Sequence, residues 1–321
     1  MANPDISVVV CTYNPDWEEL RRTLKSVLLQ TGVHFEIVIC DDGSADPLHD
    51  KIEAFFLNKG FGDYHHVINT ENNGTVINIM SGIDAASGRF IKLISPGDYL
   101  YGSSALNRLL ECAISNKSDL AFGDVIFFDP KPADFTPIEW EAWPQDAEIY
   151  NDHQAQETIK RNQLLLSDNI HGVSTIVSRD LFIKYLEMVK GKVKYCEDLV
   201  YRLMVNDGVC ISYCNEAVVL YGFGDGISTS QDDKWNRLIK QDWDAVNQII
   251  IESGQNSNSF IRKFKKVKDT KFYRSKMIKM ASYMVASPHL LMIKTRRMLF
   301  KRLTCIDVDK SYISILYGGE R

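Results

Sequence analysis

The residues best suited to chemistry in this 321-residue chain are short polar clusters that each come directly after an apolar run. They are Thr12-Tyr13-Asn14, Asp41-Asp42, Asn72 to Thr75, and Asp98. If the apolar runs are parallel strands, their carboxyl ends meet at one edge of a sheet, where such sheets bind ligands. The four clusters together predict a site for a nucleotide-type ligand.

Two further sets of residues carry side chains that could react. Glu197 and Asp198 precede an apolar helical stretch, and His171 lies in a polar segment over residues 169–175. A carboxylate can take the proton of an attacking hydroxyl group. Each also has a structural explanation, because acidic residues cap helices and a lone histidine is more often a hydrogen-bonded structural residue.

The clusters at 41–44 and 95–98 have an alternative interpretation as turns. Asp, Gly and Ser are typical turn residues, and Ser95-Pro96-Gly97-Asp98 has the composition of a β-turn. Taken alone, the second cluster favours the turn. The series of clusters as a whole favours a ligand site.

The elements that must position these residues alternate between strand and helix. Apolar runs predict strands at 6–11, 35–40, 66–68 and 90–94, with helices between them, the first capped by Asn14 with Pro15 in its first turn. Further helices are expected at 104–115, 154–166 and 181–188, strands at 120–128 and 218–221, and mostly helix from 234 onward. Repeated β-α-β units imply an α/β, Rossmann-like, mostly parallel sheet flanked by helices.

An ordered set of motifs resembles family 2 glycosyltransferases of the GT-A fold. The set is Val8-Val-Val-Cys-Thr-Tyr-Asn14, Gln30-Thr31, Ile37-Val-Ile-Cys-Asp-Asp-Gly-Ser44, Asn73-Gly74-Thr75, Gly82-Ile83, Ala86-Ser-Gly-Arg-Phe-Ile91, Asp98, Glu197-Asp198 and Gly226-Ile-Ser-Thr229. No single motif is decisive, but their order and spacing are specific. The resemblance covers roughly residues 5 to 230.

The resemblance implies transfer of one sugar from a nucleotide diphosphate donor, usually with inversion at the anomeric carbon. Asp98 would hold Mg²⁺ or Mn²⁺ on the diphosphate, Asp198 would be the general base with Glu197 beside it, and His171 is a candidate on the acceptor side. Tyr13 would lie against the nucleobase and Asp42 would accept from its ring N–H. The full predicted nucleotide-binding set is Thr12, Tyr13, Asn14, Asp41, Asp42, Asn73 and Gly74.

Two features depart from the family pattern. The cluster at 95–98 holds one acid where relatives have two or three, and Ile79-Met80 stands where many relatives have Arg-Asn before Gly82. A single carboxylate suffices for Mg²⁺ if phosphates and water complete its shell. We expect a nucleotide-sugar-binding half at 1–100, an acceptor-binding half at 101–230 and a basic helical region at 231–321.

Charge is distributed unevenly along the chain. Residues 259–305 contain 14 Lys and Arg and one acid, so the remainder has 23 basic and 41 acidic residues (37 − 14 and 42 − 1). Basic and apolar residues alternate in 262–268 and 294–302, which is typical of helices on an anionic membrane surface. The alternative is a solvated face of a packed helical subdomain. Nucleic acid is not an expected partner, because no binding module accompanies the basic run.

Other sequence features limit the possible cellular location of the protein and the kinds of site that it could contain. The seven cysteines have no pairing pattern, and the chain opens directly into a strand-like run, so we expect a reduced, cytoplasmic protein without a signal peptide. The longest apolar stretch, 280–293, is too short to span a bilayer. No Walker A motif, HExxH motif or zinc-type cysteine spacing is present.

The sequence thus predicts an inverting, metal-dependent glycosyltransferase, peripheral on the inner face of the cell membrane. Its donor would be a nucleotide sugar, and the family resemblance favours a UDP-sugar. Its acceptor would be a lipid-linked saccharide from which a cell-surface polysaccharide such as capsule or O-antigen is built. The main alternative is a non-catalytic nucleotide-sugar or polysaccharide-binding module. A nucleotidyltransferase is weaker, because the first strand–helix turn has no Gly-rich phosphate loop. The sequence does not predict an oligomeric state.

Overall fold

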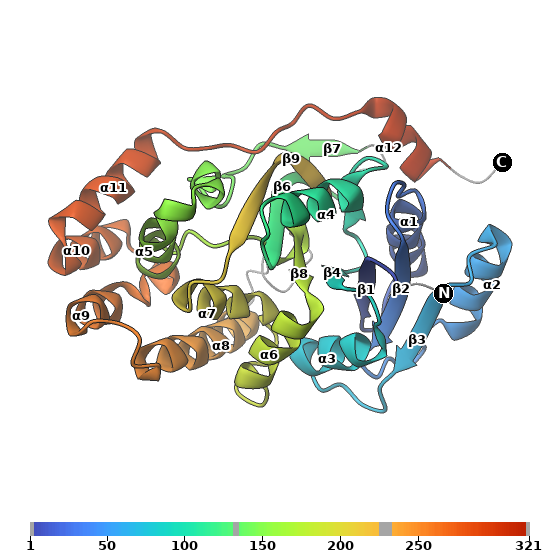
Figure 1. Ribbon diagram of the computed structural model, residues 1–321, viewed down its shortest axis with the longest axis horizontal. Coiled ribbons are helices and arrows are strands. Elements are labelled where there is room, and N and C mark those ends of the chain that lie inside the picture. Colours follow the sequence, from blue (N-terminus) through green and yellow to red (C-terminus); the bar gives the residue numbers. More distant parts are fainter. Residues whose placement is uncertain (1–2, 131–134, 225–232, 319–321) are drawn as a thin grey trace.

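The computed structural model describes residues 3–130, 135–224 and 233–318, and places a single mixed sheet at the centre of the molecule (Figure 1). The strand order is β3-β2-β1-β4-β8-β6-β9-β5, with β7 paired to β6. The strands are β1 (Ile6–Thr12), β2 (Phe35–Asp41), β3 (Tyr64–Ile68), β4 (Phe90–Ile94), β5 (Tyr99–Leu100), β6 (Leu120–Asp129), β7 (Thr136–Ile138), β8 (Thr175–Ser178) and β9 (Ile211–Gly222).

The first four strands form the expected parallel unit. β1 pairs in parallel with both β2 and β4, and β2 pairs in parallel with β3. Beyond β4 the sheet becomes mixed: β8 runs antiparallel to β4 and β6, whereas β6 and β9 are parallel. The carboxyl ends of β1, β2 and β4 therefore lie at one edge, as the positions of the polar clusters require.

Helices cover both faces of the sheet because successive strand residues point to opposite sides. Val8 and Val10 pack with α1, α2 and α4, whereas Val9 packs with α3, α6 and α7. The helices are α1 (Trp17–Leu28), α2 (His49–Lys59), α3 (Thr75–Ala85), α4 (Ala105–Ser115), α5 (Gln156–Leu166), α6 (Arg179–Val189) and α7 (Val200–Asn206).

The first helix begins later than the sequence suggests. Asp16 is its N-cap, and its side chain accepts from the backbone N–H groups of Glu18 and Glu19. Asn14 instead adopts a left-handed conformation with φ of 46°, and its side-chain oxygen accepts from Ala45 N at 3.2 Å. The prediction that Asn14 caps this helix was wrong, because Asp16 accepts from the first helical N–H groups. Asn14 instead connects the end of β1 to the loop after β2 through its hydrogen bond with Ala45.

The C-terminal region is helical, as expected, and packs against the second half of the sheet domain. It comprises α8 (Asp233–Glu252), α9 (Asn258–Val267), α10 (Lys276–Ala286), α11 (Pro288–Leu299) and α12 (Lys310–Tyr317). In Figure 1 the chain leaves α11, runs along one side of the molecule and places α12 beside α1. There Lys25 Nζ donates to the carbonyl oxygens of Ile315 and Gly318. In the described part of the chain no helix is long and apolar enough to cross a membrane.

Candidate active site

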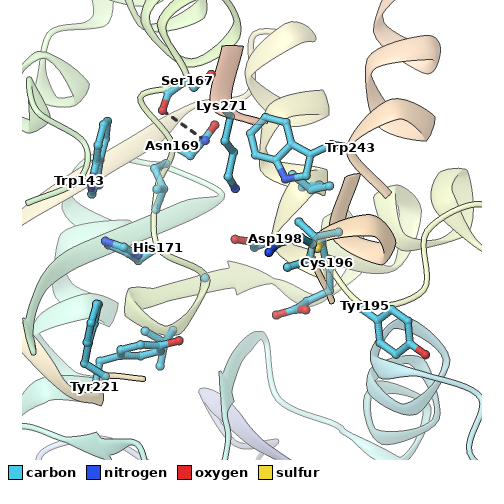
Figure 2. A pocket seen from close by; sticks show the side chains of 18 of the residues that line it. Trp143, Ser167, Asn169, His171, Tyr195, Cys196, Asp198, Tyr221, Trp243 and Lys271 are labelled. Carbon is cyan, nitrogen blue, oxygen red and sulfur yellow. Dashed lines mark hydrogen bonds between the residues drawn. The ribbon is translucent and has the colours of Figure 1, made fainter. Parts of the chain in front are cut away.

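A cavity of about 1980 Å³ lies between the strand ends of the parallel unit and the C-terminal helices. Tyr13 and Asn14 after β1 and Asp98 after β4 line it. Glu197 and Asp198 line the same cavity, as does His171; Figure 2 shows Asp198 and His171. Residues about 100 positions apart in sequence thus share one cavity, and the structure brings Asp98 and Asp198 to the same solvent-filled space.

Five of the predicted nucleotide-binding residues lie behind this cavity lining. Asp41 is fully buried, and its carboxylate accepts from the Thr12 hydroxyl at 2.9 Å and from the backbone N and hydroxyl of Ser44 at 2.7 and 2.6 Å. Ser44 Oγ in turn accepts from Asn14 N. Asp41 therefore holds the strand end that carries Tyr13 and Asn14.

Asp42 makes a similar connection to the loop before α3. Its two carboxylate oxygens accept from the backbone N–H groups of Asn73 and Gly74, each at 2.9 Å. Gly74 has φ of 90°, and a Cβ there would lie 2.4 Å from the Lys194 side chain, so glycine is required. Burial raises the pKa of Asp42. In this structure Thr12, Asp41, Asp42, Asn73 and Gly74 bind one another, whereas Tyr13 is 54% exposed and open to a ligand.

Asp98 closes a turn and faces the cavity. Its backbone N–H donates to Ser95 O at 3.1 Å, and one carboxylate oxygen accepts from Gly222 N at 3.2 Å. The turn interpretation is therefore correct for the backbone, and the turn presents the carboxylate to the cavity. Burial raises the pKa of Asp98 to about 7. Behind it, Lys92 is fully buried, with its pKa lowered to about 7 by desolvation, and its ammonium donates to Val173 O.

Asp98 is the carboxylate that the turn itself presents to the cavity, and Glu19 of α1 also lines the cavity. Among the described residues, no group of three or more His, Cys, Asp or Glu side chains could hold a metal ion. Mg²⁺ in phosphate-binding sites often has one or two carboxylate ligands and takes its other ligands from phosphates and water. Asp98 fits that coordination, and it does not form a metal site by itself.

Glu197 and Asp198 lie in the short 3-10 helix η4 (Glu197–Leu199) that leads into α7. The loop before them is fixed by Asp242 of α8, whose carboxylate accepts from the backbone N–H groups of Lys194, Tyr195 and Cys196 at 2.9, 2.7 and 3.0 Å. Asp242 is 4% exposed. This role was not predictable from the sequence, because one acid in a polar helical stretch has the pattern of a surface residue.

The two acids of this pair are in different electrostatic surroundings. Burial raises the pKa of both, that of Glu197 to about 8, and the neighbouring charge of Asp198 raises the pKa of Glu197 further. Lys271 and Arg202 favour the ionised form of Asp198, whereas no cation has this effect on Glu197. We infer that the proton of the pair stays on Glu197 near neutral pH. The cations beside Asp198 favour its carboxylate form, which is the state that a general base requires.

A comparison with known families decides the classification. The model described as glycosyl transferase family 2 matches residues 7–186, which is more than half of the chain. The chain belongs to this glycosyltransferase family. The family prediction made from the motifs is confirmed.

Individual relatives match shorter parts of the chain. EpsH of Bacillus subtilis (strain 168) is 35% identical over 100 residues, which is 31% of this chain and 28% of EpsH. The PGL/p-HBAD biosynthesis glycosyltransferase of Mycobacterium bovis (strain BCG / Pasteur 1173P2) is 32% identical over 128 residues, or 39% of this chain and 48% of the relative. The chain thus matches less than half the length of these curated relatives.

A solved structure extends the likeness to most of the chain. Residues 1–349 of S. aureus TarS in complex with UDP-GlcNAc superpose with a TM-score of 0.57, covering 89% of this chain and 82% of that one at 16% identity. The likeness shows a shared fold. The predicted GT-A fold, an α/β sheet flanked by helices with a C-terminal helical region, is confirmed.

In this glycosyltransferase, His171 lies on the same side of the cavity as Asp198. Its ring is edge-on to Phe127 with centroids 5.6 Å apart, and its buried Nε2 atom has no hydrogen-bond partner among the described residues. Desolvation and then Lys271 lower its pKa to about 4, so the imidazole is neutral at pH 7. The next residue must be small, because a Cβ on Gly172 would lie 3.0 Å from the Cβ of Asp198.

The C-terminal helices contribute a cavity lining that the motifs did not predict. From residue 233 onward the lining includes nine Lys and Arg and one acid, Asp233, whereas residues before 100 contribute three acids and no Lys or Arg. The nine are Arg237, Lys240, Lys271, Arg274, Lys276, Lys279, Lys294, Arg297 and Lys301. The basic composition of this region was evident from the sequence, but its position in the active site depends on tertiary packing.

The predicted late loop at 226–229 lies outside the described residues.

Proposed function

We propose that this glycosyltransferase transfers a single sugar from a UDP-sugar to an acceptor hydroxyl, with inversion at the anomeric carbon. The observation that carries the proposal is the shared cavity, lined by Asp98 on the donor side and by Asp198 opposite it. The TarS complex with UDP-GlcNAc supports a UDP-sugar as the donor. The similarity to the mycobacterial PGL/p-HBAD biosynthesis glycosyltransferase supports a role in the biosynthesis of a glycosylated product.

The chemistry follows from where the two carboxylates lie. Tyr13, exposed at the end of β1, would stack on the base, and the diphosphate would extend toward Asp98. Asp198 would accept the proton of the acceptor hydroxyl as its oxygen attacks the anomeric carbon, with UDP leaving from the opposite face. Such a base contributes roughly 10²- to 10⁴-fold in rate. Glu197, holding its own proton, would keep the pair at a single negative charge.

The proposed cofactor is Mg²⁺ or Mn²⁺. Asp98 would be its protein ligand and the donor diphosphate would supply others; the bound ion would stabilise the negative charge that develops on UDP.

Binding and turnover of the donor test this proposal directly. UDP should raise the melting temperature in the presence of Mn²⁺, and the shift should be much smaller in Asp98→Ala. UDP-sugar hydrolysis or transfer should be lost in Asp198→Ala while UDP binding is kept. Metal-stimulated UDP binding without turnover across a panel of acceptors would instead favour a non-catalytic binding module. Failure to bind any nucleoside diphosphate would contradict both.

We also propose that the protein lies on an anionic membrane surface through α10 and α11, and acts on a lipid-linked acceptor at the inner leaflet. Large apolar side chains on these helices are exposed, among them Met277 (83%), Leu299 (71%) and Phe300 (76%). Met284, Met292, Leu299 and exposed Arg296 line a shallow surface groove. Apolar side chains flanked by cations fit the headgroup layer of a bilayer that contains acidic lipids.

Vesicle flotation tests this surface. The protein should float with vesicles containing phosphatidylglycerol and not with pure phosphatidylcholine, and Leu299→Ser with Phe300→Ser should abolish flotation. Leu57→Ser, which removes an equally exposed apolar side chain from α2, is the matched control. Flotation unaffected by the α11 substitutions, or absent at physiological salt, would exclude this surface.

A further inference from the structure

Four lysines of the cavity lining form no direct ion pair with an acidic side chain of the described residues. Among the described residues, the side chains of Lys271, Lys276, Lys279 and Lys294 make no hydrogen bond and no ion pair, although all four line the cavity. We call these four residues the cationic wall. Other cations of the lining are paired: Lys240 with Asp244, Arg274 with Asp233, Arg297 with Asp146 and Asp168, and Lys301 with Glu141.

Two members of the wall are held in place by aromatic rings. Lys271 Nζ lies 4.2 Å from the centroid of the Trp243 ring, and Lys294 Nζ lies 5.7 Å from that of Trp143. Figure 2 shows Lys271 extending beside Trp243 toward Asp198. Desolvation lowers the pKa of both lysines. Partly desolvated ammonium groups without a counter-ion are unfavourable, and an anionic ligand in the cavity would relieve this cost.

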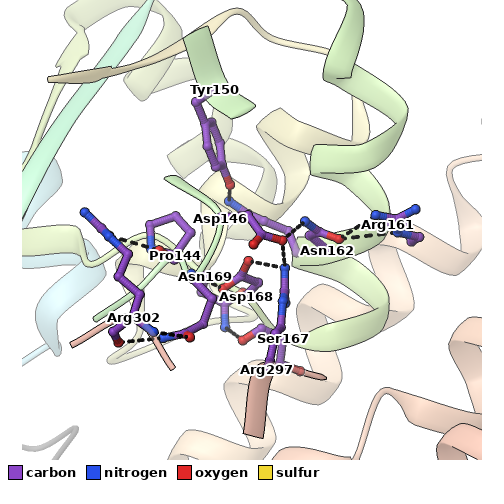
Figure 3. Close-up of polar contacts among 12 residues, drawn as sticks. Pro144, Asp146, Tyr150, Arg161, Asn162, Ser167, Asp168, Asn169, Arg297 and Arg302 are labelled. Carbon is purple, nitrogen blue, oxygen red and sulfur yellow. Dashed lines mark hydrogen bonds and ion pairs between the residues drawn. The ribbon is translucent and has the colours of Figure 1, made fainter. Parts of the chain in front are cut away.

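The helix carrying Lys294 is anchored by a separate cation. Arg297, one turn further along α11, donates to Asp168 at 2.8 Å and to Asp146, and is itself 7% exposed (Figure 3). These carboxylates form their direct ion pairs with Arg297 and none with Lys294. The nearby acids thus pair with Arg297, and Lys294, which lines the cavity, forms no direct ion pair among the described residues.

One member of the wall, Lys271, lies near Asp198. The electrostatic influence of Lys271 reaches Asp198 and His171, whereas the charged groups that act on Asp98 are Lys92 and Glu19. A ligand that contacts Lys271 would therefore lie near the general base. The diphosphate of the donor would lie near Asp98 and away from the wall.

We propose that the cationic wall binds a phosphate or diphosphate group of the acceptor, so that the acceptor of this glycosyltransferase is a phosphate-bearing molecule. This inference rests on the proposed function for the position of the acceptor. It deepens that function by naming what is recognised besides the reacting hydroxyl. Both a lipid-linked diphosphate and a phosphate within a soluble or polymeric saccharide present this group.

The test measures the binding of a second anion to protein that is already saturated with UDP and Mn²⁺. Titration calorimetry would follow inorganic pyrophosphate in one arm, and phosphatidylcholine vesicles with or without polyprenyl diphosphate in the other. Lys271→Ala and Lys294→Ala should each weaken binding about tenfold or more, since hydrogen bonds to charged groups contribute roughly 1.5–3 kcal/mol. Lys265→Ala, an exposed lysine of α9 outside the cavity, should not. Lys271→Arg should retain most of the binding.

The outcomes separate this inference from the proposed function. Absence of UDP binding would contradict the proposed function itself. If UDP binds but neither phosphate probe does, or if both probes bind the variants as tightly as the wild type, the cationic wall has no such role. Loss of UDP affinity in parallel with pyrophosphate affinity would assign the lysines to the donor diphosphate and overturn the inference. Tighter binding of the polyprenyl diphosphate vesicles would identify a lipid-linked acceptor, and tighter binding of pyrophosphate a soluble or polymeric one; either supports phosphate recognition.

Discussion

The two regions around the cavity differ in whether their charged groups are bonded to other groups of the protein. At the donor edge, Asp41 and Asp42 are buried and each accepts at least two hydrogen bonds from the protein. On the proposed acceptor side, burial raises the pKa of both Glu197 and Asp198, and the four lysines of the cationic wall form no direct ion pair among the described residues. Charges that the protein satisfies stabilise the fold, whereas unsatisfied charges are a cost that a substrate can relieve.

The largest effect expected from this contrast is on turnover. Asp198→Asn keeps the shape of the side chain and removes the base, so kcat should fall roughly 10²- to 10⁴-fold. UDP affinity should be unchanged, because Asp198 lies across the cavity from Asp98. Steady-state kinetics of transfer, with UDP binding measured separately, check this. Glu197→Gln is the matched control, and an equal loss of kcat there would mean that Asp198 is not the base.

The same contrast exists within the C-terminal helices, where Arg297 is paired and Lys294 is not. Removing Arg297 leaves Asp168, which is 1% exposed, as a buried carboxylate without its counter-ion. Arg297→Met should therefore lower the free energy of unfolding by about 3–5 kcal/mol, as measured by urea denaturation. Lys294→Met should change it by less than about 0.5 kcal/mol. Similar losses for both substitutions would show that the wall is structural.

How much of this could be predicted from the sequence differs between the two sides for a physical reason. Thr12, Asp41 and Asp98 follow strands whose apolar runs are local signals, so both the parallel unit and the clusters at its edge were predictable. Lys271, Lys294 and Asp242 lie on helices and a turn whose packing depends on contacts far along the chain. Their residue types alone fit a solvated surface equally well. The basic composition indicated an anionic partner, but not that part of it faces the active site.

At the donor edge, a conservative substitution should cost stability. Asp41→Asn replaces a carboxylate that accepts from Thr12 and twice from Ser44, and the amide cannot accept all three bonds with equal strength. We expect a loss of about 1.5–3 kcal/mol in the free energy of unfolding, together with weaker UDP binding because the loop bearing Tyr13 is released. Urea denaturation and UDP titration of the same variant check this. A variant as stable as the wild type would show that these hydrogen bonds position the loop without stabilising the fold.

The last expected effect is a gain in stability instead of a loss, and it comes from the substitution Glu197→Gln. Glu197 has its pKa raised from 4.5 to about 8 in the folded protein. Between those values the unfolded chain has released a proton that the folded chain keeps, so this group makes stability fall as pH rises from about 4.5 to about 8. Glu197→Gln removes the titration, and the variant should match the wild type near pH 4.5 and become progressively more stable than the wild type as the pH rises toward 8. Thermal unfolding across this pH range measures the difference. A slope that is the same in both proteins would mean that Glu197 is ionised in the fold, and would remove the reason for assigning the pair's proton to it.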